Sequence, residues 1–442
     1  MQVSVETTGG LKRLMKVQVP SERVDKEVES RLHSLKGQVR LDGFRPGKVP
    51  LKVLERRYGA QVRSEVLSEV VQSTYSEALD QENLRPAGSP EIEPVETSTG
   101  KDLEYHASFE ILPEVEVKGV ESITIERPKV DIDDAQIDDV LERLRKQHAE
   151  YREVERAAAE SDRVTIDFKG TVDGEEFEGN SGEDVPVVLG SGQMPEEFEA
   201  QLPGVSAGEQ KSVEYTFPEQ FPDETIAGKK AVFEVTVKKV EEPELPELND
   251  EFAKTLGIED GLDALRARVR ESLERERDQA VRARVKTQAM DGLFAANDVE
   301  LPQVLLDGEI DQLREQAKQR MRQYGEGEGD DEPDLPSSEF EEEARRRVTL
   351  GLLVNEIVRA NEIQLDQQRL QQALQQVASG YERPQEVIQY YMQNRELMQN
   401  LEIQVMEDQV VDWIEERAQI QDKPMSFDEL VGRAATEGSE EE

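Results

Sequence analysis

The chain has 442 residues, of which 98 are Asp or Glu and 54 are Lys or Arg, so its formal net charge is −44. This length is too great for a single hydrophobic core and predicts several domains. The negative charge argues against a general nucleic-acid-binding protein, and the lack of cysteine excludes disulfides, thiolate nucleophiles and thiolate metal sites.

Residues 1–112 are expected to form a compact α/β unit. Residues 11–20 have the pattern of a strand, Ser21 is a candidate N-cap for the helix that follows, and Leu103 to Ile111 alternate as in a half-buried strand. The first sixty residues carry a charge of +6, whereas the rest of the chain carries −50. This end of the molecule therefore favours an anionic partner.

A loop with the sequence GFRPGKVP follows the first helix and places Phe44 beside two cations, Arg45 and Lys48. Glycines give its backbone freedom and prolines restrict it. From the residues alone, a solvated basic loop whose Phe44 folds back on its own domain is the simpler interpretation. The alternative is an exposed apolar anchor for a partner.

Residues 113–150 are predicted to be a connector with an amphipathic helix, which begins at an Asp133–Gln136 capping box. Residues 151–245 are predicted to be rich in strands, with an Asp-Gly turn after which Phe177 begins the next strand. Half of the chain's phenylalanines fall in this segment: Phe168, Phe177, Phe198, Phe217, Phe221 and Phe233.

Aromatic residues at alternate strand positions usually form a core, but their number in this short segment favours a pocket. An apolar pocket without a nucleophile or a metal suits rotation about a prolyl peptide bond. That bond resists rotation by ~18–20 kcal/mol because of amide resonance. Transfer of the amide into an apolar slot disfavours the charge-separated resonance form, and no proton transfer is needed.

Residues 246–424 are predicted to be helical, with Asn249 as an N-cap, Gly257 as a helix stop and Pro302 in a first turn. The insert at 325–334 is predicted to be a mobile loop, and residues 425–442 an acidic, disordered tail. Most apolar stripes of this body are expected to be packing surfaces. Methionines suit adaptable surfaces, and the candidates are Met321, Met392, Met398 and Met406.

No metal or cofactor is expected. His33, His106 and His148 belong to no ligand or triad motif, and no phosphate-binding loop of the Gly-x-x-x-x-Gly-Lys type is present. No signal peptide or apolar run of ~20 residues is visible, so we expect a cytoplasmic protein without a membrane partner.

Three segments resemble one known family in the same order along the chain. The stretch DRVTIDFKGTVDGEEFEG, with GSGQM, FPEQF and GKKAVFEVTVKKVEEPELPEL, is similar to the FKBP-type prolyl isomerase domain within bacterial trigger factors. GFRPGKVP resembles that family's ribosome-docking signature, and EEEARRRVTLGLLVNEIVRANEI resembles its carboxy-terminal domain. The resemblance implies a multidomain α+β fold: an α/β ribosome-binding head, an FKBP-like antiparallel β-sheet domain and an all-α chaperone body.

The resemblance implies an ATP-independent chaperone that binds nascent and unfolded polypeptides beside the exit tunnel of the large ribosomal subunit. It also implies prolyl isomerase activity and weak homodimers, and it implies no DNA partner. The implied docking residues are Gly43, Phe44, Arg45, Pro46, Gly47 and Lys48. The implied isomerase residues are Phe168, Phe177, Glu178, Met194, Phe198, Phe221 and Phe233.

One segment departs from the family pattern. Where the family commonly has Met-Ile-Pro-Gly-Phe-Glu, this chain has MPEEFE at residues 194–199. Pro195 then occupies the position whose backbone N–H meets the substrate carbonyl, and proline has no N–H. Glu196 and Glu197 add charge at the pocket rim. We therefore expect weakened isomerase activity, and the alternative function is a holding chaperone with a vestigial isomerase domain.

Overall fold

The structure is a computed structural model that describes residues 1–39, 44, 49–172, 175, 177, 179–219, 221, 226–323, 335–381 and 383–432. Contacts divide the chain into two units. The first joins Met1–Arg127 to Arg282–Lys423, and the second joins Pro128–Val281 to the residues from Pro424 onward. None of the described helices is long and apolar enough to cross a membrane.

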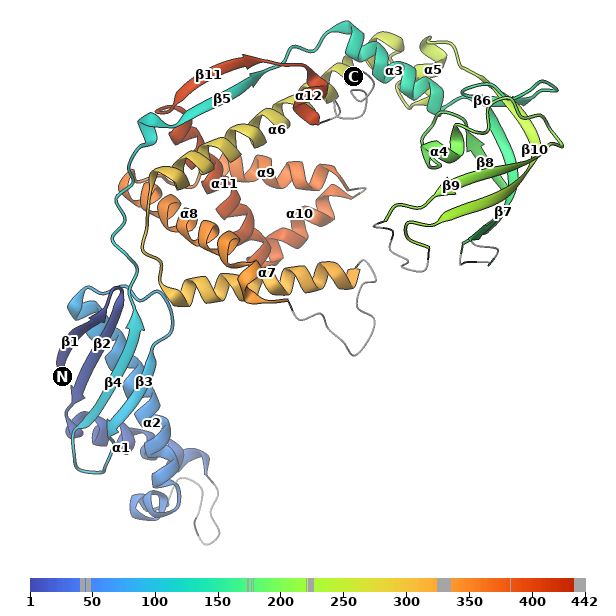
Figure 1. Cartoon of the computed structure of the whole chain (residues 1–442). Coiled ribbons are helices and arrows are strands. Elements are labelled where there is room, and N and C mark those ends of the chain that lie inside the picture. The colour runs from blue at the N-terminus through green and yellow to red at the C-terminus, as the bar shows by residue number, and fades with distance from the viewer. Residues whose placement is uncertain are drawn as a thin grey trace. The chain divides into compact units, whose positions relative to one another are not determined.

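The head of the first unit is an antiparallel sheet packed against two helices (Figure 1). The strands lie in the order β1-β2-β4-β3, and the helices are α1 and α2. Their bounds are β1 Gln2–Gly9, β2 Lys12–Val19, α1 Ser21–Gln38, α2 Leu51–Glu82, β3 Glu91–Glu96 and β4 Leu103–Glu110. Burial alternates along β4 as its sequence predicts.

A buried hydrogen bond ties the head's sheet to its long helix. The Tyr105 side chain on β4 is fully buried, and its hydroxyl lies 2.9 Å from Thr74 Oγ1 on α2. The prediction that Ser21 caps α1 is wrong, because Ser21 is the first helical residue. Pro20 occupies the N-cap without a side-chain hydrogen bond.

Helices make up most of the rest of the first unit. α7 and α8 share one buried cluster, and α9 and α11 share another. The bounds are α6 Leu262–Ala296, which continues from the second unit, α7 Gln303–Gln323, α8 Glu341–Ala360, α9 Gln367–Ser379, α10 Pro384–Gln393 and α11 Arg395–Glu415. Two short 3₁₀ helices lie at Val120–Ser122 and Ser337–Glu339. The predicted loop at 325–334 lies outside the described residues.

The second unit contains a five-stranded antiparallel sheet, in which β10 pairs with β6, β7 and β9, and β7 also pairs with β8. The bounds are β6 Glu150–Glu153, β7 Arg163–Val172, β8 Ser181–Val188, α4 Glu196–Glu199, β9 Gln210–Thr216 and β10 Lys230–Glu244. Phe177 does not begin a strand: it lies in the connection before β8, which starts at Ser181.

An arm made of α3 (Asp134–Gln147), α5 (Asp250–Thr255), the start of α6 and α12 (Phe427–Val431) completes the second unit. The predicted caps are confirmed: Asp133 and Gln136 form a capping box on α3, and the Asn249 side chain accepts from the N–H groups of Glu251 and Phe252. Gly257 follows α5 with a φ of 79°.

The carboxy-terminal segment is ordered further than the sequence predicts. β11 (Gln419–Pro424) pairs with β5 (Thr124–Lys129), and Phe427 of α12 is only 2% exposed in the arm's core. A capping box at Ser426 and Glu429 begins α12. The expectation of disorder from residue 425 is therefore wrong for residues 425–431. Residues 433–442 lie outside the described part of the chain.

Candidate functional site: an aromatic cluster in the second unit

Phe233 of β10 is the centre of a connected group of phenylalanine rings. Its ring centroid lies 6.0 Å from that of Phe168, 6.2 Å from that of Phe177 and 5.5 Å from that of Phe198, and all three pairs meet edge to face. This geometry is the one that aromatic quadrupoles prefer. The structure therefore brings these four residues, predicted as site residues from the sequence, into one place.

Two residues that were not predicted as site residues extend the cluster. Phe217 follows β9 and lies 5.7 Å from Phe177 and 4.8 Å from Phe221, so it links the loop at Phe221 to the other rings. Tyr215 stacks edge to face on Phe217 at 5.0 Å. Tyr215 and Phe217 are two residues apart, the spacing of one strand face, but this spacing does not distinguish a pocket wall from an ordinary core.

The rings differ in exposure, and this gives the cluster a floor and an open side. Phe198, Phe217 and Phe233 are at most 8% exposed, whereas Phe168, Phe177 and Phe221 are half-buried. The buried rings supply an apolar floor, and the half-buried rings keep part of their surface exposed. Glu178, the remaining predicted residue beside Phe177, lies outside the described residues.

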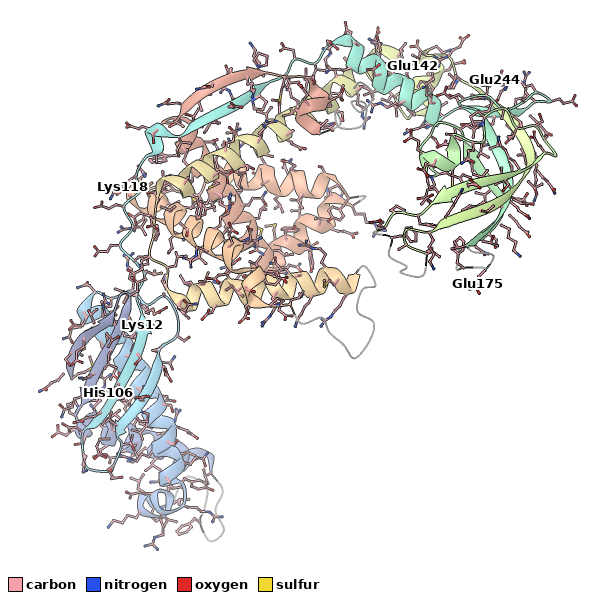
Figure 2. The ribbon with its side chains drawn as sticks, viewed as in Figure 1. Lys12, His106, Lys118, Glu142, Glu175 and Glu244 are labelled. Carbon is pink, nitrogen blue, oxygen red and sulfur yellow. The ribbon has the colours of Figure 1, made fainter. Side chains whose placement is uncertain are left out.

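Two glycines make room for the rings. Gly170 lies opposite Phe233 across the β7–β10 pair, and a Cβ built on it would lie 2.5 Å from Phe233 Cε1. A Cβ on Gly182 of β8 would lie 2.7 Å from Phe168 Cε1. Any larger residue would force the rings to move, because a packed interior does not absorb an extra methyl group without strain. Near the hairpin tip, Glu175, labelled in Figure 2, forms an isolated bridge with Val172.

A buried carboxylate holds the loop that carries Met194. Glu199 of α4 is 7% exposed, and its two carboxylate oxygens accept hydrogen bonds from the N–H groups of Ser191 at 3.0 Å and Gly192 at 3.2 Å. Hydrogen bonds to a charged acceptor are stronger than neutral ones. Met194 is half-buried against the domain core. The helix that supplies the Phe198 floor therefore also fixes the loop beside it. Sequence reasoning did not identify Glu199.

Pro195 forms the N-cap of α4, with φ of −54° and ψ of 137°. Its carbonyl accepts hydrogen bonds from the N–H groups of Phe198 and Glu199, both at 2.9 Å. Glu196 and Glu197 are exposed. Pro195 thus serves as the N-cap of α4, but it supplies no N–H at the edge of the aromatic cluster.

An ion pair supports the entry to β7 in the same domain. The Asp162 side chain is 2% exposed and accepts hydrogen bonds from Arg156 Nη2 at 2.9 Å and from the Ala159 N–H at 2.7 Å. Burial acts to raise the pKa of Asp162, but these hydrogen bonds outweigh it and hold the pKa below its ordinary value.

The loop between α1 and α2, for which docking was predicted, is described at Phe44 and at its two ends. Phe44 is 39% exposed and is not part of the head's core cluster. Val39 and Val49 both pack against that core, and Pro50 is the N-cap of α2. Gly43, Arg45, Pro46, Gly47 and Lys48 lie outside the described residues.

The helical body exposes several large apolar side chains near α10 and α11. The most exposed are Tyr381, Tyr390, Met392 and Ile403, at 58–70%. Of the methionines predicted as adaptable surface residues, only Met392 belongs to this exposed group. Met398 packs against the α9–α11 cluster, and Met321 and Met406 are half-buried.

No cluster of three or more His, Asp or Glu side chains is placed to hold a metal ion in the described part of the chain. The histidines have separate surroundings. His148 Nδ1 lies 2.9 Å from the Leu144 carbonyl oxygen, and its ring packs on Phe252. His106, labelled in Figure 2, lies on β4 of the head.

Three family models match three segments of the chain. Residues 1–144 match the model described as bacterial trigger factor protein, and residues 261–416 match the trigger factor C-terminus. Residues 154–238, which contain the aromatic cluster, match the FKBP-type peptidyl-prolyl cis-trans isomerase.

Similar proteins cover nearly the whole chain. The trigger factor of Alkalilimnicola ehrlichii is 62% identical over 432 residues, which span 98% of this chain and 95% of that protein. The trigger factor of Halorhodospira halophila is 58% identical over 437 residues, with 98% of both chains covered. A solved structure described as "Promiscuous Substrate Recognition in Folding and Assembly Activities of the Trigger Factor Chaperone" is 18% identical, with a TM-score of 0.51. That match covers 94% of this chain and 99% of the other and indicates a shared fold.

Proposed function

The chain belongs to the trigger factor family, ribosome-associated chaperones that carry a peptidyl-prolyl isomerase domain, and from this premise we propose the residues through which it acts. Its general partners are the ribosome and nascent polypeptides, and its enzymatic activity is prolyl cis-trans isomerisation. The observation that carries the assignment of residues is the connected ring cluster around Phe233, which lies in the FKBP-type segment.

The aromatic cluster binds the substrate's proline and the residue before it. Phe198, Phe217 and Phe233 form the apolar floor, and Phe168, Phe177, Phe221 and Met194 form the walls. Removal of water from the prolyl amide weakens its charge-separated resonance form and lowers the barrier to rotation, which is ~18–20 kcal/mol in the free bond. The family resemblance assigns Glu178 to the same site.

The pocket assignment is tested with full-length Phe233→Leu and Phe198→Leu variants and a Phe-Pro peptide substrate. We expect kcat/KM to fall at least tenfold with either variant, because each removes an edge-to-face contact and part of the floor. Phe340→Leu, in the α7–α8 cluster, is the matched control and should leave turnover unchanged. Unchanged turnover in both pocket variants would refute the assignment.

The docking loop attaches the head to the large ribosomal subunit beside the exit tunnel. Exposure of Phe44, outside the head's own core, supports an apolar anchor over a ring folded back on its domain. Arg45 and Lys48 would pair with acidic protein groups or phosphate, and Gly43, Pro46 and Gly47 would set the loop's path. Val39 and Val49 hold its two ends on the domain core.

The docking assignment is tested by co-sedimentation with ribosomes at low ionic strength. Replacement of Phe44, Arg45 and Pro46 by alanine should abolish co-sedimentation, because it removes the anchor and one cation. The same variant should retain isomerase turnover, since the aromatic cluster lies in the other unit. Retained co-sedimentation would contradict the assignment.

The helical body holds unfolded chains through many weak apolar contacts, without ATP. The exposed group Tyr381, Tyr390, Met392 and Ile403 supplies the adaptable apolar surface that such contacts need. Serine in place of these four residues should weaken suppression of the aggregation of a denatured test protein by severalfold, with ribosome binding intact.

A second candidate function is a holding chaperone whose isomerase domain turns over slowly. Pro195 favours it, because the backbone at this position has no N–H to donate to a substrate carbonyl. We also propose weak homodimers and a cytoplasmic location. Sedimentation velocity over a concentration series tests the dimer, and cell fractionation tests the location.

A further inference from the structure

A groove of about 630 Å³ lies where the arm meets the isomerase sheet in the second unit. We call it the arm groove. It is bounded by the last turns of α3, by Tyr151 of β6, by the end of β8 and by the end of β10. Its apolar lining consists of Tyr151, Pro186, Val188, Leu189, Pro243 and Leu245. None of the rings of the aromatic cluster lines it, although Ser191 and Gln193, in the loop that carries Met194, do.

The charge of the arm groove is opposite to that of the protein. Arg143, Lys146 and Arg163 line it, and no lining residue is acidic, although the chain as a whole carries −44. Arg143 and Lys146 lie three residues apart and share one face of α3. Both side chains are exposed, and neither makes an ion pair with any described residue. Two cations are therefore available to a ligand.

The third cation is already engaged. Arg163 donates to both carboxylate oxygens of Glu241, at 2.8 and 2.9 Å, and its guanidinium lies 4.1 Å from the centre of the Tyr151 ring. This stack positions Tyr151 as an aromatic wall of the groove. Glu241, the one carboxylate in this contact, is neutralised by the pair.

The acidic residues of β10 and α3 beside the groove are directed elsewhere or paired. Glu160 is an exposed carboxylate next to the lining residue Gly190, on which a built Cβ would lie 3.6 Å from Glu160 Oε1. Side chains of successive strand residues point to opposite faces, so Glu242 and Glu244 of β10 alternate with the lining residues Pro243, in β10, and Leu245, which follows it. Glu142 of α3 pairs with Arg145 at 2.9 Å. Glu142 and Glu244 are labelled in Figure 2.

We propose that the arm groove binds an acidic, apolar peptide segment of another polypeptide. The apolar lining takes leucine- or phenylalanine-like side chains, and Arg143 and Lys146 pair with carboxylates of the same segment. The volume lies in the range of about 300–1,000 Å³ that is typical of ligand pockets. Because residues 61–442 carry a charge of −50, acidic segments are repelled by most of the surface around the groove, and the groove gives them a place to bind that requires no proline.

The test uses the full-length protein and a fluorescein-labelled peptide of alternating Glu and Leu residues, measured by fluorescence anisotropy. Charge reversal with Arg143→Glu and Lys146→Glu should weaken binding about tenfold, and Leu245→Ala should weaken it severalfold. The matched control is Lys254→Glu with Arg395→Glu, which changes the net charge equally at exposed positions outside the groove. The control should bind nearly as the parent does, and affinity of the parent should fall with added salt.

A peptide with Gln in place of every Glu should bind at least tenfold more weakly than the acidic one. Equal binding of the two peptides, or equal loss in the groove and control variants, would overturn the proposal. Displacement of the acidic peptide by a Phe-Pro isomerase substrate would also overturn it, because that result places the peptide on the aromatic cluster. The groove variant should keep parental isomerase turnover and ribosome co-sedimentation, so the outcome is distinguishable from failure of the proposed function.

Discussion

Replacement of Pro195 by isoleucine should raise isomerase activity. The proline's φ of −54° and ψ of 137° are accessible to an ordinary residue, and its carbonyl would continue to cap α4. The substitution therefore restores one backbone N–H at the cluster's edge without removing an existing hydrogen bond. A hydrogen bond contributes about 0.5–1.5 kcal/mol net, so a bond made to the substrate carbonyl in the transition state should raise kcat/KM about two- to twelvefold.

Exchange of a Phe-Pro peptide, followed by protease-coupled absorbance or by NMR, measures the effect. Pro195→Ala restores the same N–H without the larger side chain, so a rise in both variants identifies the N–H as the cause. Pro203→Ala, at an exposed position outside the cluster, serves as the control and should have no effect. If both Pro195 variants match the parent within experimental error, the absent N–H does not limit this enzyme and the reasoning is refuted.

Three further substitutions test the packing and electrostatics of the same domain. Gly170→Ala should lower the free energy of unfolding of this domain by about 1–3 kcal/mol, because the added methyl group clashes with Phe233. Thermal denaturation measures this loss. An unshifted melting curve would show that the ring has room to move. Glu199→Gln should lower kcat/KM about tenfold, because the neutral amide offers only one oxygen to two N–H donors. Ribosome co-sedimentation should stay at the parental level, and full turnover would contradict the positioning role. Since the folded-state pKa of Asp162 is depressed, its contribution to stability is present above the ordinary carboxyl range and is lost as pH falls through the folded-state value. The melting temperature of the domain should therefore fall on acidification less steeply in Asp162→Asn than in the parent, and identical slopes would argue against this assignment.

Local signals predicted local structure well. The Asp133–Gln136 capping box and the Asn249 cap each depend on residues no more than three positions apart, and both form as expected. Alternation along Leu103–Glu110 likewise gives the observed burial pattern. These features depend on neighbours within a few residues, which a sequence displays directly.

Features that depend on distant residues were not predictable in the same way. Pairing of Gln419–Pro424 with β5 joins segments that are far apart in the chain, so the sequence around Phe427 looked like the start of a tail. The role of Glu199 depends on the path of the loop at Ser191, and nothing in the sequence distinguishes it from the exposed glutamates beside it.

The β5–β11 pair has a consequence for the biosynthesis of the protein itself. Within the described residues, β5 pairs with β11 alone, and Arg127 bonds to Asp422 at 2.8 Å across 295 positions of sequence. At a translation rate of about 5–20 residues per second, β5 waits about 15–60 s for its partner strand. The N-terminal head can fold from its own residues while translation continues. The β5–β11 sheet, in contrast, forms only after nearly the whole chain has been synthesised. A chaperone of nascent chains thus remains incompletely folded for much of its own synthesis.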